Sequence, residues 1–221
     1  MRVKEKGFEE RAIEEEDGIF GWDAITEAFE KMYPGQDNPK HYGTLISWRF
    51  GGNDPLPGIS IYDGGDYWHF VTYGLSEVYE KETDNQEISG YGMEFTLKLK
   101  KENLGDEEEE EREIKGLCGI LQSIARITFT QGEVFGIYEY LYTGQTEGID
   151  VKMKSNITGF ITVPEPKCKS IDTPNGKVEF VELIGVTDRE LKSIMAKELQ
   201  VKEVYALLDS DVTDYSRESV L

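Results

Sequence analysis

The segment YWHFVTY, which begins at Tyr67, carries a bulky or apolar side chain at nearly every position. Successive side chains of an extended strand point to opposite faces of the sheet. Both faces would therefore be largely apolar: Trp68, Phe70 and Thr72 on one, and Tyr67, His69, Val71 and Tyr73 on the other. Such a strand is typical of a sheet that other elements cover on both sides. We therefore expect a layered fold around a central sheet.

Two strands are predicted before this segment. GTLISWRF (43–50) and GISIYD (58–63) are rich in β-branched and aromatic residues. Between them lies GGNDPLPG (51–58), and DGGD (63–66) leads into the next strand; both are dense in turn-forming residues. The pattern predicts consecutive strands joined by short turns.

A longer strand is predicted at GYGMEFTLKLKK (90–101), because apolar and polar residues alternate along it. The apolar set is Met93, Phe95, Leu97 and Leu99, and the polar set is Glu94, Thr96, Lys98 and Lys100. We interpret this as a strand with one solvated face.

Further strands are expected at NITGFITVPEP (156–166), which its prolines would end, and at KVEFVELIGV (177–186). The pattern between 130 and 155 is weaker. There VFGIYEYLY and GIDVKMK are compatible with short strands.

Helices are predicted at three places. Trp22, Ile25, Phe29 and Met32 recur at helical spacing, and Pro34-Gly35 ends that helix. A second helix spans 112–129, and the acidic run 105–113 is either a solvated loop or its first turn. TDRE (187–190) forms a capping box that opens a third helix, which leads toward VKEVYALLD.

Strands mixed with helices predict an α+β or mixed α/β fold. Its centre would be a mostly antiparallel or mixed sheet covered by helices. We place a single compact domain over residues 18–221 and a polar N-terminal segment over 1–17.

Asp and Glu number 44 against 24 Lys and Arg, so the formal net charge is −20. Such a charge repels phosphate backbones and anionic lipid, so we expect neither nucleic acid nor membrane as a partner. It would instead attract a basic protein. No apolar stretch has the length of a signal peptide or a membrane span. We expect a cytoplasmic protein in which Cys118 and Cys168 are reduced thiols.

Little in the sequence points to catalysis. GxSxG, GxGxxG and GxxxxGK[ST] motifs do not occur, and His41 and His69 are far apart with no cysteine spaced to complete a metal site. We predict no catalytic residues, no cofactor and no metal. His69 is interpreted as a hydrogen-bonded core residue, with a catalytic role beside a carboxylate as the alternative. Tyr79 follows the predicted strand end, where it would either contact a partner or pack against the fold.

Several ordered motifs give the chain a resemblance to the suppressor of fused family. It is carried by Gly51-Gly52 with Asp54-Pro55-Leu56, Trp68-His69-Phe70 with Tyr73-Gly74-Leu75-Ser76, Ser89-Gly90-Tyr91-Gly92 with Glu94-Phe95-Thr96, DTPNGKVEFVELIGVTDREL (172–191) and VTDYSRESV (212–220). The similarity runs from about Gly18 to the end.

The resemblance implies a mixed α/β domain without catalytic activity. Animal members are two-lobed regulators of the Hedgehog pathway that clasp an extended peptide of a transcription factor. This chain is similar to their N-terminal lobe only. Bacterial stand-alone members are regarded as immunity proteins against toxins. The family's peptide site implies partner contacts at Tyr79 and, on the acidic loop after it, at Asp84 or Glu87.

We therefore expect a non-catalytic protein-binding module of the stand-alone bacterial type that neutralises a toxin domain. The alternative is a regulatory or scaffold protein that captures an extended peptide of an endogenous partner.

Overall fold

The computed structural model describes residues 18–46, 48–102, 104–142 and 144–221, so the predicted polar segment 1–17 lies outside the described residues. The helices are α1 (Phe20–Met32), α2 (Glu107–Gln131), α3 (Asp188–Met195) and α4 (Val201–Leu208), with a short 3-10 helix η1 (Trp48–Phe50). The strands are β1 (Lys40–Gly43), β2 (Gly58–Asp63), β3 (Tyr67–Tyr73), β4 (Ile88–Lys100), β5 (Tyr140–Leu141), β6 (Ile157–Pro164), β7 (Ser170–Thr173) and β8 (Gly176–Thr187).

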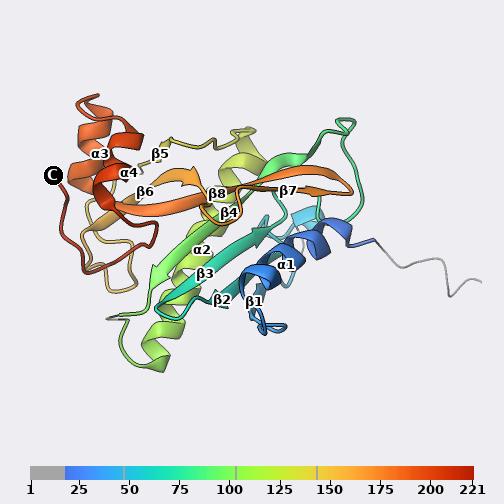
Figure 1. The fold of residues 1–221 in the computed structure, drawn as a ribbon, viewed down its shortest axis with the longest axis horizontal. Coiled ribbons are helices and arrows are strands. Elements are labelled where there is room, and N and C mark those ends of the chain that lie inside the picture. The colour runs from blue at the N-terminus through green and yellow to red at the C-terminus, as the bar shows by residue number, and fades with distance from the viewer. Residues whose placement is uncertain (1–17, 47, 103, 143) are drawn as a thin grey trace, which may run out of the picture.

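All of these strands belong to one 8-stranded sheet in the order β1-β2-β3-β4-β8-β6-β5, with β7 paired to β8 (Figure 1). β4 and β8 run parallel, and the other neighbouring strands run antiparallel. The sheet is therefore mixed, and the predicted α+β fold class is confirmed.

Helix α1 covers one face of the sheet (Figure 1). Its residues Ile25 and Phe29 are fully buried, and they pack in one cluster with Tyr62, Tyr73 and Phe180 of the sheet. The spacing of Ile25 and Phe29 is one helical turn, so both lie on the side that faces the strands. The predicted amphipathic helix is confirmed.

Helix α2 contributes to the core on the other face. Its N-cap Asp106 accepts a hydrogen bond from the Glu109 amide, and Gly132 ends the helix in the left-handed conformation. The acidic run therefore forms the beginning of the helix, where carboxylates are favoured by the helix dipole. The apolar side of α2 packs against the strands through Ile114, Leu117, Leu121, Ile124 and Ala125.

A third cluster lies beside β6 and β8, where α3 and α4 pack on the sheet. The capping box predicted at the start of α3 is present: Thr187 and Glu190 exchange side-chain and backbone hydrogen bonds. The segment after α4 returns to the sheet, where the Thr213 amide donates to the Lys98 carbonyl and the Lys100 amide donates to Thr213.

The strand predicted at 43–50 is wrong. Gly43 ends β1 instead of starting a strand, and Trp48–Phe50 form η1. Leu45 and Phe50 are highly exposed. Their apolar character therefore marks a surface loop, whereas the true edge strand uses the more polar residues just before it. GIDVKMK forms turns rather than a strand, and β5 is only two residues long.

The solvated face predicted for the strand at 90–101 is also wrong. Glu94, Thr96 and Lys98 are almost completely buried, and only Lys100 is partly exposed. Glu94, Thr96 and Lys98 find partners from other parts of the chain instead of water. The alternation was real, but the polar face lies inside the protein.

Candidate partner-binding groove

A groove lies where β3 leaves the sheet, and a strained glycine starts it. Gly74 has a φ of +123°, a conformation that side chains disfavour, and a Cβ there would lie 2.3 Å from Pro57 Cδ. Beyond Gly74 the chain runs through a loop and returns as β4. The glycine therefore allows the chain to turn away beside Pro57.

Glu94 of β4 holds the beginning of this loop. Its carboxylate accepts hydrogen bonds from the Thr72 hydroxyl at 2.6 Å, from the Gly74 amide at 2.8 Å, and from the Ser76 amide and hydroxyl at 2.9 and 2.6 Å. Complete burial raises the pKa of Glu94 to about 7, although these hydrogen bonds favour the carboxylate. The side chain thus fixes residues 74–76 from beneath.

Glu77 holds the rest of the loop in the same way. Its side chain accepts from the Lys81 ammonium at 2.7 Å and from the amides of Glu82, Thr83 and Gly90 at 2.7, 2.6 and 3.0 Å. Burial would raise its pKa, but these hydrogen bonds outweigh burial and lower the pKa of Glu77 to about 2. The loop is therefore organised around one carboxylate.

Replacing Glu77 by Gln should cost about 2 kcal/mol of unfolding free energy at pH 7. A carboxyl group whose pKa is lowered by folding stabilises the protein above its ordinary value of 4.5 and loses that contribution as the pH falls toward 2. Urea unfolding of wild type and Glu77→Gln at pH 7 and pH 3 checks this. A stability difference that does not shrink at the lower pH would contradict the assignment.

The groove itself has a volume of about 390 Å³. Its walls combine the 74–83 loop with aromatic rings from three separate elements: Trp48 of η1, Tyr91 of β4 and Phe129 of α2. Phe129 packs edge-on against both other rings, at centroid distances of 5.9 and 5.4 Å. An aromatic cavity with polar groups at its rim suits the side chains of a protein or peptide ligand.

Tyr79 lies in the wall of this groove and is 46% exposed. The Asn175 side-chain amide donates to the carbonyls of Glu77 and Tyr79 at 2.7 and 2.6 Å, so the turn between β7 and β8 holds the backbone beneath the ring. The tyrosine ring is thus presented to solvent on a fixed backbone.

Asp84 and Glu87 are exposed on the same loop, but the residues that line the groove instead include Glu80 and Glu82. Glu82 forms an ion pair with Arg49 of η1 across the groove rim. Sequence reasoning missed the aromatic wall. Trp48 lay within a strand that was predicted incorrectly. Phe129 lies in the last turn of a predicted helix, and the helical pattern does not reveal what that turn faces.

The signature residues Trp68, His69, Phe70 and Tyr73 lie along β3. His69, Phe70 and Tyr73 are fully buried, whereas Trp68 is partly exposed beneath the Lys101 ammonium, 3.9 Å from the ring centroid. The core interpretation of His69 is confirmed: its Nδ1 is hydrogen-bonded to the Tyr33 hydroxyl at 2.6 Å. His69 does not line the groove, and the described residues that do line it include no histidine.

Cys118 and Cys168 are free thiols, as expected. Burial raises the pKa of the Cys118 thiol to about 12, so it is a packed side chain and not a nucleophile. Among the helices in the described part of the chain, none has both the length and the apolar character of a membrane span.

Comparisons with known proteins agree with this architecture. A family model described as Suppressor of fused protein (SUFU) matches residues 52–218. The chain is 27% identical over 186 residues to the suppressor of fused homologs of Homo sapiens and Mus musculus, which covers 78% of this chain and 37% of each relative. It therefore spans well under half the length of these curated relatives.

Two solved structures are similar over almost the whole chain. A chain of the structure described as the Sufu-Fu complex superposes with a TM-score of 0.76 at 26% identity, covering 92% of this chain and 93% of that chain. The structure of Drosophila Suppressor of Fused superposes with a TM-score of 0.77 at 26% identity, covering 92% of this chain and 52% of that chain.

Proposed function

The chain belongs to the suppressor of fused family, and from this premise we propose that it is a non-catalytic regulatory or scaffold module that captures an extended segment of a protein partner. The observation that carries the proposal is the aromatic groove beside Tyr79, whose loop is held by two carboxylates. A relative solved in a structure described as the Sufu-Fu complex supports protein binding as the activity.

The chemistry of the groove favours binding over catalysis. Where the structure describes the lining of the groove, it contains neither histidine nor cysteine. Among its carboxylates, Glu77 accepts several hydrogen bonds, Glu82 is paired with Arg49, and Glu80 is exposed to solvent. Aromatic rings and a rigid backbone are instead what a partner's anchor residues require, because preorganised pockets cost little conformational entropy on binding.

Charge indicates what the partner should look like. The net charge is −20, and the loop beside the groove adds Glu80, Asp84 and Glu87 at exposed positions. We propose that the partner segment combines an apolar or aromatic anchor with basic residues. Its association rate should therefore fall as the salt concentration rises, because steering between opposite charges is screened by salt.

Toxin neutralisation stays a prediction within this proposal. The acidic charge suits a basic toxin, such as a nuclease, but the comparisons support regulatory protein binding more directly. Calorimetry against toxins encoded beside the gene, at two salt concentrations, separates the two functions. Absence of binding to every such toxin would leave only the regulatory function.

Replacing Tyr79 by Ala should weaken peptide binding about 30-fold, or about 2 kcal/mol, because an exposed ring in a groove wall acts as a central anchor. The test selects ligands from a displayed library of unstructured peptides and measures the dissociation constant of the best one. Tyr140→Ala is the matched control, since Tyr140 is 43% exposed but lies outside the groove.

The unfolding free energy of both variants should stay close to wild type, which separates loss of contact from loss of fold. If the selected peptide binds Tyr79→Ala as tightly as wild type, the groove is not its site. If Tyr140→Ala is the weaker binder, the site lies near β5, at the edge of the sheet.

A further inference from the structure

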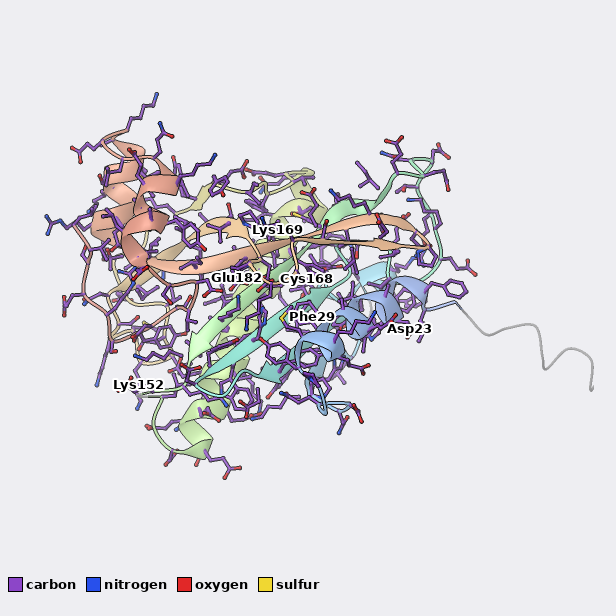
Figure 2. All side chains as sticks on the ribbon, in the orientation of Figure 1. Asp23, Phe29, Lys152, Cys168, Lys169 and Glu182 are labelled. Carbon is purple, nitrogen blue, oxygen red and sulfur yellow. The ribbon has the colours of Figure 1, made fainter. Side chains whose placement is uncertain are left out.

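A second group of chemically active side chains is buried beneath α1, away from the groove. It consists of His69 on β3, Glu182 on β8 and Glu165 just after β6, all with no exposed surface. One ligand atom from each of the three lies within 4.8 Å of the others. Figure 2 labels Glu182 near the middle of the sheet.

Only one of the two ring nitrogens of His69 has a hydrogen-bond partner. Its Nδ1 is hydrogen-bonded to the Tyr33 hydroxyl, while its Nε2 has no hydrogen-bond partner although it is completely buried. Nε2 lies 3.6 Å from the carboxylate oxygen Oε2 of Glu182. Buried polar atoms without partners are rare, so this atom requires an explanation.

The separation of 3.6 Å is too long for a hydrogen bond. It is close to the separation of about 3.4 Å between two ligands that each lie about 2.1 Å from one tetrahedral metal ion. If His69 Nδ1–H donates to the Tyr33 oxygen, Nε2 presents its lone pair toward the carboxylates. That second hydrogen bond is how proteins orient a metal-ligating histidine.

The two carboxylates are held in place by other parts of the chain. Glu182 Oε2 accepts from the Thr96 hydroxyl, whereas Glu182 Oε1 is buried without a partner. Glu165 Oε2 accepts from the amides of Lys167 and Cys168, which fixes that carboxylate with Oε1 turned toward the cluster. Thr96 thus holds the oxygen of Glu182 that faces His69, and Glu165 Oε1 is held by the Lys98 ammonium at 2.8 Å, a contact that a metal ion there would displace.

Charge in the cluster is not balanced. Lys98 Nζ lies 2.8 Å from Glu165, 2.6 Å from Asp211 and 3.4 Å from Glu182, and it is the one ammonium that contacts these three carboxylates in the described residues. Three carboxylates therefore face one ammonium. Uncompensated charge is costly inside a protein, and a divalent cation would neutralise it.

We propose that His69, Glu165 and Glu182 bind a divalent transition-metal ion, with Lys98 remaining on Asp211 and Tyr33 orienting the histidine. Imidazole with carboxylate ligands suits ions such as Zn²⁺. The side chain of Asp211, which contacts Lys98 at 2.6 Å, is 29% exposed. This site is separate from the proposed groove and would hold β3, β8 and the segment after β6 together.

The test uses the untagged full chain, freed of metal with a chelator, and Zn²⁺ as the probe. We expect uptake of about one Zn²⁺ ion per chain in calorimetry. The chain has only two histidines, so ¹⁵N-histidine spectra report each ring separately. Zn²⁺ should shift Nε2 of His69 and leave His41, which is hydrogen-bonded to Ser60, unchanged.

Tyr33→Phe should weaken Zn²⁺ binding by about 10- to 100-fold, because it removes the group that orients the ligating ring. His41→Gln is the control and should bind as wild type does. Since Tyr33→Phe preserves the ring packing, circular dichroism should show an intact fold. No uptake by the wild-type chain, a shift at His41 instead of His69, or equal affinity of Tyr33→Phe would each overturn the proposal.

Discussion

Replacing Lys98 by Met is expected to lower the free energy of unfolding by about 3–5 kcal/mol, because it leaves buried acids without their ammonium. Lys98 is 1% exposed and contacts Glu165, Glu182 and Asp211. Those contacts raise the Lys98 pKa above its ordinary value despite burial, so the side chain is charged at neutral pH. Methionine fills a similar volume but carries no charge.

Urea unfolding of the metal-free protein at pH 7 measures the effect. The matched control is Lys31→Met, which removes a lysine from an ion pair with Glu27 whose side chains are 72% and 67% exposed. Surface pairs contribute about 0–1 kcal/mol, so this variant should remain near wild type. If Lys98→Met were no less stable than Lys31→Met, the buried cluster would not depend on its ammonium.

Replacing Glu94 by Ala is expected to cost about 3 kcal/mol, because the donors of Thr72, Gly74 and Ser76 lose their buried acceptor. The same change should abolish high-affinity peptide binding, since residues 74–76 line the groove. Glu94→Gln should be milder, because its carbonyl oxygen still accepts from the two amides. Urea unfolding and peptide titration measure both effects.

The pH dependence distinguishes the carboxylate from the amide. Folding raises the pKa of Glu94 from 4.5 to about 7, so the folded state keeps its proton while the unfolded chain has lost it. Stability from this group is therefore lost as the pH rises between these values, by up to about 3 kcal/mol. The stability of wild type relative to Glu94→Gln should fall over that range. A constant difference would contradict the raised pKa.

Much of the sheet follows directly from local sequence. The strands at 58–63 and 67–73 begin where the pattern places them, and Gly and Asp residues form the turn between them. The helix after Gly18 and the capping box at Thr187 also follow from neighbouring residues. Such signals are readable because spacing, turn chemistry and caps act over only a few residues.

The errors lie where apolar or polar character has a tertiary cause. Leu45 and Phe50 have strand-like character but are exposed, Leu45 after β1 and Phe50 in η1, next to the groove-lining residues Thr44, Trp48 and Arg49. The sequence places Tyr79 after a strand end and leaves open whether it contacts a partner or packs against the fold. In the structure its ring is exposed in a groove wall. No local pattern indicates that Trp48 and Phe129 meet there.

The sequence by itself determined the fold class and the positions of most strands, because periodicity and turn residues report local geometry, and its ordered motifs carried the resemblance to the family. Only the tertiary structure decided that Glu94 and Lys98 are buried. Alternation shows that one face of a strand is polar, but not what covers it. Two of the acids that contact Lys98 are far from it along the chain: Glu165 is 67 residues away and Asp211 is 113 residues away. A buried charge is stabilised by partners that only folding brings together, so its environment cannot be read from its neighbours in sequence.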